Sequence, residues 1–430
     1  MSESLFPVRI RIVAIMLGLA LLAPPTQAGV GGIEWRVAML TGAQETPPVA
    51  SAAFGGGVFV IDKCANTLSY YIVFQGLTET AAHIHGFAGP GAAAGVVHAL
   101  PAGNPKIGVW AYTDAQEPSI LAGLTYVNIH TAANPGGEIR GQIVTHVAEL
   151  DGAQETPPVA SAAGGWGAFN IDTVTNTLSY YIVFGGVAET AAHIHGYAAH
   201  GAPAGVVHPL PAGSPKVGVW NYPEANERQI LDGMTYVNIH SAANPGGEIR
   251  GQIVPIVAPI DGMQEVPANV TPGAGVGLHS LNRAADVLGF DIRHGSLMGM
   301  ETAAHIHGFA PRGASAGVIF PLPSPATRKL GTWVYGAANE ANLLAGLTYI
   351  NIHSTFDAAG EIRGQIEFPP HPCIADLDGD GSVGLADLAI LLGSYGMSPA
   401  QYCDGDLDGD GAVGLGDLAI LLGQFGLMCL

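Results

Sequence analysis

The chain has 430 residues, a formal net charge of −20, 61 glycines and 30 prolines. Its length allows three or four domains, and few charged residues with abundant glycine and proline are typical of a turn-rich β protein. This composition argues against a helical bundle and against a disordered chain. The acidity argues against nucleic acid as a partner, because an acidic surface repels phosphate groups.

The chain begins with a segment typical of a secretory signal peptide, predicted over residues 1–28. Arg9 and Arg11 precede an apolar run over residues 12–23, and a small-residue cleavage site ends at Ala28. The run is short for a bilayer span, and a retained membrane anchor is the alternative. We therefore expect a protein that is secreted or located at the cell surface or in the periplasm, with no membrane span in the mature chain.

Three copies of one module follow, and the first two are offset by 110 residues (193 − 83). A period of this length indicates folded domains and not a solenoid. We predict domains over residues 35–145, 146–255 and 256–368.

Within the first copy, short apolar and β-branched runs alternate with turn signals, which predicts strands. The predicted strands cover residues 35–40, 57–61, 67–74, 81–86, 95–100, 107–112, 124–130 and 138–144, and a brief helix is predicted over 117–123. Seven or eight short strands in roughly 110 residues predict a mainly β fold, with an antiparallel β-sandwich in each copy.

Each copy places two histidines in the motif AAHIHG. Alternation along a strand puts His83 and His85 on one face, and we expect His98 and His130 from other strands to complete a four-nitrogen site. Imidazole suits copper and zinc, and four nitrogens in a plane favour copper(II). The alternative is that these histidines only form hydrogen bonds that hold loops in place. The candidate ligands in the other two copies are His193, His195, His208, His240, His305, His307 and His353.

The third copy carries Phe320 where the others have His98 and His208, so we expect it to bind metal more weakly. In the motif GGEIRGQI, Glu138 or a backbone carbonyl is a candidate acceptor for the second ring nitrogen of a metal-bound histidine. Because Glu138 and Arg140 are two residues apart on one predicted strand face, we favour an ion pair between them over a catalytic role for Arg140.

At these residues the copies resemble the CHRD domain, a module named after chordin that also occurs in tandem in exported bacterial proteins. The resemblance is carried by GAQETPP (42–48), TLSYYIVFQGL (67–77), AAHIHG (81–86) and VNIHTAANPGGEIRGQI (127–143), and it extends over residues 35–368. It implies an extracellular β-rich fold and no well-established activity.

Each copy is also similar, more weakly, to copper-zinc superoxide dismutase, which orders its copper ligands as His-x-His, a third and a fourth histidine, followed by an arginine. In the first copy the matching residues are His83, His85, His98, His130 and Arg140. No histidine lies between His98 and His130 to build a zinc site, and no copy has the cysteine pair that braces the enzyme. The similarity implies a sandwich and a copper site more than it implies dismutation.

Residues 371–430 contain nine aspartates and no glutamate, lysine or arginine. Two blocks thirty residues apart follow the EF-hand pattern, in which oxygens at positions 1, 3, 5, 7 and 12 bind calcium and glycine occupies position 6. An apolar stretch after each block predicts one short helix, packed through Leu388, Leu391 and Leu392 or through Leu418, Leu421 and Leu422. The predicted ligands are Asp376, Asp378, Asp380, Ser382 and Asp387, and then Asp406, Asp408, Asp410, Ala412 and Asp417.

This tail, residues 375–430, resembles the duplicated loop and helix of a type I dockerin. The resemblance implies a small all-α domain that binds two calcium ions. Dockerins bind cohesins, so an extracellular or cell-surface partner similar to a cohesin is a hypothesis for the tail.

The cysteines agree with export. Cys64 is alone in the first copy, whereas Cys373, Cys403 and Cys429 lie in the tail. An oxidising compartment permits one disulfide within the tail, and the sequence leaves its pairing open.

These features predict an exported, non-enzymatic binding or scaffold protein, with three sandwiches in a rigid rod and a calcium-binding tail for attachment or assembly. The alternative is a copper-binding redox protein, similar to superoxide dismutase, that uses the histidine clusters. A hydrolase finds little support, because no copy shows a paired-carboxylate cleft or a nucleophile motif.

Overall fold

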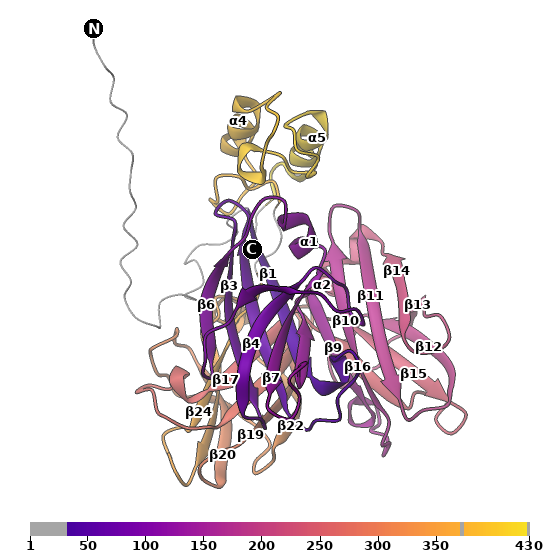
Figure 1. Ribbon diagram of the computed structural model, residues 1–430, viewed down its shortest axis with the longest axis vertical. Coiled ribbons are helices and arrows are strands. Elements are labelled where there is room, and N and C mark those ends of the chain that lie inside the picture. Colours follow the sequence, from indigo (N-terminus) through magenta and orange to yellow (C-terminus); the bar gives the residue numbers. More distant parts are fainter. Residues whose placement is uncertain (1–31, 370–373, 428–430) are drawn as a thin grey trace.

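The structure is a computed structural model that describes residues 32–369 and 374–427 (Figure 1). The predicted signal peptide, Cys373 and Cys429 lie outside these ranges. Among the helices within them, none combines the length and the apolar character that crossing a bilayer requires.

The three repeats have the same order of elements, and the predicted mainly β class is confirmed. The first repeat contains β1 (Ile33–Thr41), η1 (Gly42–Gln44), β2 (Phe54–Asp62), β3 (Thr67–Gln75), β4 (Glu79–Gly86), β5 (Val96–Ala99), β6 (Lys106–Ala111), α1 (Glu117–Leu121), β7 (Thr125–Thr131) and β8 (Ile139–Gln142). Each strand predicted for this repeat is present, with ends shifted by a few residues.

The second and third repeats follow the same plan. The second contains β9 (His146–Asp151), η2 (Gly152–Gln154), β10 (Gly164–Asp172), β11 (Thr177–Gly185), β12 (Glu189–Gly196), β13 (Val206–Pro209), β14 (Lys216–Asn221), η3 (Glu224–Asn226), α2 (Glu227–Leu231), β15 (Thr235–Ser241) and β16 (Ile249–Ile253). The third contains β17 (Ile256–Asp261), η4 (Gly262–Gln264), β18 (Ala274–Asn282), β19 (Val287–Gly295), β20 (Glu301–Gly308), β21 (Val318–Pro321), β22 (Arg328–Val334), η5 (Ala337–Asn339), α3 (Glu340–Leu344), β23 (Thr348–Ser354) and β24 (Ile362–Ile366).

Each repeat forms one continuous antiparallel sheet of eight strands, and not the two separate sheets of the predicted sandwich. The strand order in the first repeat is β5-β4-β7-β8-β1-β2-β3-β6, and the other two repeats have the equivalent order. The first four strands of this order form one half and the last four form the other. The two halves are joined because β1 pairs with β8, where Thr41 lies opposite Arg140. The inner faces of both halves meet in one core, to which Phe59, Ile84 and Ile129 contribute fully buried side chains.

The repeats lie side by side around a shared apolar core, so the predicted rigid rod is wrong (Figure 1). A rod would leave each repeat with its own separate core, whereas one buried cluster here takes residues from all three repeats. Its largest members include Met39 and Tyr71 of the first repeat, Trp166 of the second and Leu278 of the third.

The joints between repeats close a ring. The loop after β4 in each repeat contacts the β2-β3 hairpin, or its equivalent, in the next repeat. The Gly91 backbone lies against the Tyr181 hydroxyl, the His200 ring is 2.9 Å from Ser280 Oγ, and the Arg312 guanidinium lies 5.6 Å from the Tyr71 ring centroid. Because the third contact returns to the first repeat, the three units are joined head to tail without a free end.

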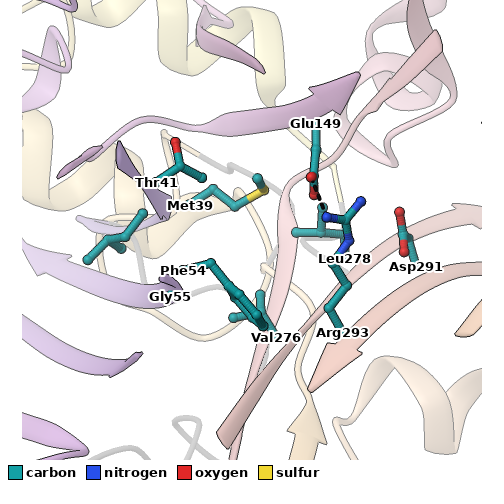
Figure 2. A pocket seen from close by; sticks show the side chains of 10 residues that line it. Met39, Thr41, Phe54, Gly55, Glu149, Val276, Leu278, Asp291 and Arg293 are labelled. Carbon is teal, nitrogen blue, oxygen red and sulfur yellow. Dashed lines mark ion pairs between the residues drawn. The ribbon is translucent and has the colours of Figure 1, made fainter. Parts of the chain in front are cut away.

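A small cavity lies where the three repeats meet (Figure 2). Its lining includes Met39 of the first repeat, Glu149 of the second and Arg293 of the third, and Arg293 forms an ion pair of 2.5 Å with Glu149. The volume of about 40 Å³ suits a few water molecules and is far below that of a small-molecule site. The cavity is therefore part of the joint and not a candidate active site.

The tail contains α4 (Leu385–Gly393), η6 (Tyr402–Asp404) and α5 (Leu415–Gln424), which share a small core. Leu391 and Leu421 are buried in it as predicted, whereas Leu392 and Leu422 are more than half exposed. Successive residues of a helix point about 100° apart, so Leu392 and Leu422 lie at the edge of the face that Leu391 and Leu421 bury.

A disulfide joins the tail to the first repeat, between Cys64 and Cys403. Cys403 is therefore not part of the disulfide that the sequence permitted within the tail, since its partner belongs to the turn between β2 and β3. Beside the disulfide, the Lys63 ammonium lies 3.7 Å from the centroid of the Tyr402 ring. Repeats two and three have no cysteine, so this attachment is specific to the first repeat.

Candidate metal sites

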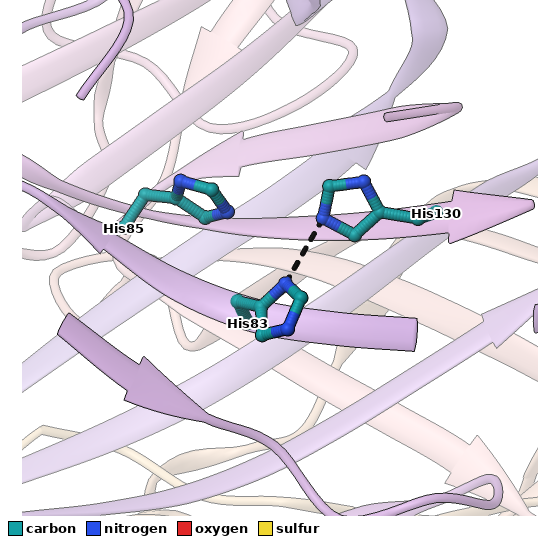
Figure 3. A group of neighbouring side chains, drawn as sticks. All are labelled: His83, His85 and His130. Carbon is teal, nitrogen blue, oxygen red and sulfur yellow. Dashed lines mark hydrogen bonds between the residues drawn. The ribbon is translucent and has the colours of Figure 1, made fainter. Parts of the chain in front are cut away.

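Strands β4 and β7 bring three histidines together on the outer face of the first repeat (Figure 3). His83 and His85 flank the fully buried Ile84, so both rings lie on the face opposite the core. His130 comes from β7, the neighbouring strand. One ring nitrogen from each histidine lies within 4.8 Å of the other two. The predicted convergence of these three histidines is thus present in the geometry.

Backbone carbonyls orient two of the three rings. His85 Nδ1 lies 3.0 Å from Ala94 O, and His130 Nδ1 lies 3.0 Å from Pro135 O. A carbonyl only accepts, so both Nδ1 atoms carry the hydrogen and both Nε2 atoms carry a lone pair. His83 Nδ1 lies 3.1 Å from His130 Nε2 and donates to it in this arrangement.

The rings also favour the neutral state. Burial lowers the pKa of His83 and of His85, and the neighbouring histidines lower both further. A neutral imidazole is the form that binds a metal ion. His83 and His85 are therefore in the ligating form at neutral pH.

The same arrangement recurs in the other repeats. The histidine pair corresponding to His83 and His130 is 3.1 Å apart in each, and the histidine corresponding to His85 bonds the equivalent carbonyl at 2.9 Å. The two further clusters are His193, His195 and His240, and His305, His307 and His353.

His98 and His208 do not belong to these clusters, so the predicted four-nitrogen site is wrong. His98 on β5 lies opposite Ile84 in the strand register, which directs its ring toward the core side of the sheet. There it stacks on Trp110, with ring centroids 6.0 Å apart. Phe320 packs on Trp333 at the same centroid distance in the third repeat, so an aromatic ring satisfies this position without a nitrogen.

Glu138 and Arg140 form no ion pair within the described part of the chain, contrary to the prediction. Glu138 accepts hydrogen bonds from Ser51 (2.8 Å) and Thr131 (2.7 Å), and it is not the acceptor for a histidine. Arg140 is buried and donates to the carbonyls of Ala92 (2.8 Å) and Gly89 (3.2 Å).

Arg140 and Tyr126 hold the loop that orients His85. The Arg140 guanidinium lies 3.5 Å from the centroid of the Tyr126 ring, and His85 stacks on that ring with an interplanar angle of 14°. The Tyr126 hydroxyl donates to Ala94 O at 3.2 Å, the same carbonyl that His85 bonds. Sequence reasoning overlooked Tyr126, although its recurrence as Tyr236 and Tyr349 was a visible signal.

A buried carboxyl lies beside each cluster and was also overlooked. Glu45 accepts from Asn128 Nδ2 at 3.4 Å, and Asn128 lies opposite His83 in the strand register. Burial raises the pKa of Glu45 to about 7, against the opposing effect of Arg140. The motif GAQETPP, present in two copies, contains this residue and its counterpart Glu155; Glu265 is the third.

The tail brings together part of each predicted calcium loop. Carboxylate oxygens of Asp376, Asp378 and Asp387 lie within 4.8 Å of one another, as do those of Asp406, Asp408 and Asp417. Asp387 accepts from the backbone amides of Leu377 (2.6 Å) and Gly384 (2.7 Å), which ties the start of the loop to the start of α4. Burial, together with the neighbouring carboxylates of Asp387 and Asp378, raises the pKa of Asp376 to about 6.

Other predicted calcium ligands lie outside these groups. Asp380 Oδ1 accepts from the Ser382 hydroxyl (2.7 Å), and Asp410 Oδ1 accepts from the backbone amide of Ala412 (2.8 Å). Both contacts are local, because each joins two residues of the same loop that are two positions apart in the sequence.

The family model of the CHRD domain matches the chain three times, at residues 36–143, 146–253 and 256–366. All three histidine clusters lie within the matched residues, and the tail lies beyond them. No curated protein matches the chain.

Proposed function

The chain belongs to the CHRD domain family, and from this premise we propose that it is an exported, non-enzymatic binding protein with a calcium-binding tail for attachment or assembly. The three domains form a compact ring, so a surface that one repeat exposes occurs three times on the molecule. Repeated presentation of one surface increases avidity for a partner that has several binding points.

The observation that carries the calcium proposal is the presence of two clusters of three aspartates in the tail. Each group places three carboxylates within 4.8 Å in a segment without lysine or arginine. Oxygen ligands at this spacing suit a hard cation such as calcium, which would offset the repulsion between the carboxylates. The oxygens of Asp380, Ser382 and Asp410 and the carbonyl of Ala412 are the further ligands expected to join when calcium binds.

The tail also has the exposed apolar side chains that an attachment partner requires. Leu385 and Leu415 occupy the same position at the start of α4 and α5, and they are 77% and 75% exposed. Two matching apolar positions on neighbouring helices support a protein partner outside the cell, of the kind that a cohesin represents.

Calcium titration of the chelator-treated full chain tests this proposal. Two calcium ions should bind per chain by calorimetry, and Asp376→Ala and Asp406→Ala should each leave one. Asp404→Ala is the matched control, because Asp404 caps η6 by accepting from Gln401 N and belongs to neither carboxylate group. An unchanged stoichiometry in both loop variants would refute the calcium assignment.

The alternative of a redox protein similar to superoxide dismutase is not carried forward. Its order of four ligands depended on His98 and His208, and the strand register directs both of these rings toward the core side.

A further inference from the structure

We propose that each repeat binds one late transition-metal ion, of the zinc(II) or copper(II) class, through three imidazole nitrogens. In the first repeat the ligands are His83 Nδ1, His85 Nε2 and His130 Nε2. The proposal is independent of calcium in the tail, because the two kinds of site share no residue.

The spacing of the nitrogens fits such an ion. A tetrahedral zinc with bonds of about 2.0–2.1 Å separates its ligand nitrogens by about 3.4 Å. His83 Nδ1 and His130 Nε2 are already 3.1 Å apart, and His85 completes the triangle within 4.8 Å. Small rotations of the side chains bring all three to one ion, and His83 then carries its proton on Nε2. A four-coordinate ion held in this way has one further position for water or another small ligand.

An unpaired nitrogen in each cluster is the second observation. His85 Nε2 is buried and has no hydrogen-bond partner within the described ranges, and the same holds for His195 Nε2 and His307 Nε2. Buried polar atoms nearly always have a partner. The same deficit at three equivalent atoms, each facing two other imidazoles, indicates a position built for a ligand.

The surrounding contacts have the form that metal sites use. Metal-binding histidines usually donate their second ring nitrogen to a carbonyl or carboxylate, which fixes the tautomer. Here the carbonyls of Ala94 and Pro135 take that role, and Tyr126 and Arg140 hold the loop that supplies Ala94.

A purely structural role accounts for less of this arrangement. Strands β4 and β7 are already paired through the backbone from Glu79 to Gly86, so a bond between His83 and His130 is not needed to join them. A structural role also gives no reason for burying the lone pair of His85 Nε2 beside two imidazoles without a hydrogen-bond donor. Nitrogen ligands without any carboxylate exclude calcium and magnesium as the ion and favour zinc or copper.

The test is a metal titration of the full chain after treatment with a chelator, with saturating calcium to occupy the tail. Zinc(II) and copper(II) are titrated separately, with calorimetry for zinc and spin resonance for copper. Three equivalents should bind per chain with similar affinity, because Phe320 replaces a residue outside the cluster. His85→Ala and, separately, His83→Gln should each leave two tight sites and weaken the third by more than about tenfold.

The chain itself offers the matched control. His98→Phe reproduces the residue found at position 320 and should keep three equivalents. Circular dichroism confirms that each variant is folded, and His83→Gln remains informative if His85→Ala does not fold. Binding of only two equivalents with a silent third repeat would overturn the three-ligand assignment. Three equivalents unchanged by both cluster variants, or no binding at all, would overturn the proposal.

Discussion

At the scale of single residues, burial decides which charges the repeats tolerate. Arg140 is buried yet remains satisfied, because its guanidinium has two carbonyl acceptors and the face of Tyr126. The nearby Glu45 carboxyl is only partly hydrogen-bonded, since Glu45 Oε1 has no hydrogen-bond partner in the described chain. The carboxyl therefore favours its protonated form, and burial raises its pKa to about 7.

This predicts a pH-dependent effect of Glu45→Gln. A carboxyl with a raised pKa in the folded state contributes stability that is present at low pH and is lost as the pH rises through about 7. Glutamine does not ionise, so Glu45→Gln should raise the melting temperature at pH 8 by about 2–4 °C and have little effect at pH 5. Thermal melts of both proteins at the two pH values provide the measurement, and an equal shift at both would contradict the prediction.

Arg140→Met should lower stability substantially. It removes four hydrogen bonds and leaves the Ala92 carbonyl without its donor, whereas the Gly89 carbonyl keeps only the backbone amide of Ala92. Unsatisfied buried groups cost about 1–3 kcal/mol each, so we expect a loss of about 3–5 kcal/mol in the free energy of unfolding. Denaturant unfolding measures this loss. Arg228→Met, at a partly exposed arginine that pairs with Asp232, is a comparison that should change stability by less than about 1 kcal/mol.

At the scale of elements, the sequence predicted the strands of a repeat but not how they associate. Alternation of apolar residues located β4 and β7, and it correctly placed His83 and His85 on one face. It could not place His98, because the face of β5 depends on its register against β4. One step in that register moves a side chain to the other side of the sheet. The sequence also could not predict the partner of Cys64. That partner lies 339 residues away and depends on how the tail docks on the first repeat.

The tail attachment predicts a distinct effect of Cys64→Ser. Without the disulfide, the tail keeps only noncovalent contacts with the first repeat, among them Lys63 on Tyr402 of η6. A disulfide typically contributes about 2–4 kcal/mol, so amide exchange in α4 and α5 should become faster in Cys64→Ser. Val174→Ser at the equivalent turn of the second repeat is the control. Peptide mapping should find Cys64 linked to Cys403, and a link from Cys403 to Cys373 or Cys429 would disprove the pairing.

At the scale of the whole molecule, the joints between repeats contain buried histidines. His200 contacts Ser280 of the third repeat, and burial lowers the pKa of His200 to about 3. Its charged form is excluded from the folded state. The unfolded chain therefore binds a proton at His200 that the folded chain does not bind. The free energy of unfolding consequently decreases as the pH falls from about 6.5 toward 3.

We therefore expect His200→Asn to reduce the acid sensitivity of the ring. Asparagine can keep a hydrogen bond to Ser280 but does not titrate. Between pH 6.5 and 4 the melting temperature of the variant should fall less steeply than that of the natural chain. An equally steep decline of the melting temperature in both proteins would show that protonation of His200 does not destabilise this joint.

The closed ring has a consequence for how such a chain can evolve. Arrays of repeats that stack in a line can lose or gain a copy, because an end is always exposed. Here the third unit must reach back to the first, and Arg312 against Tyr71 is one of the contacts that do so. A fourth copy would separate these two residues, and deleting one would leave an apolar face open to water. The molecule has the form of a trimer fused into one polypeptide, so its copy number is fixed by geometry and not by the length of the gene.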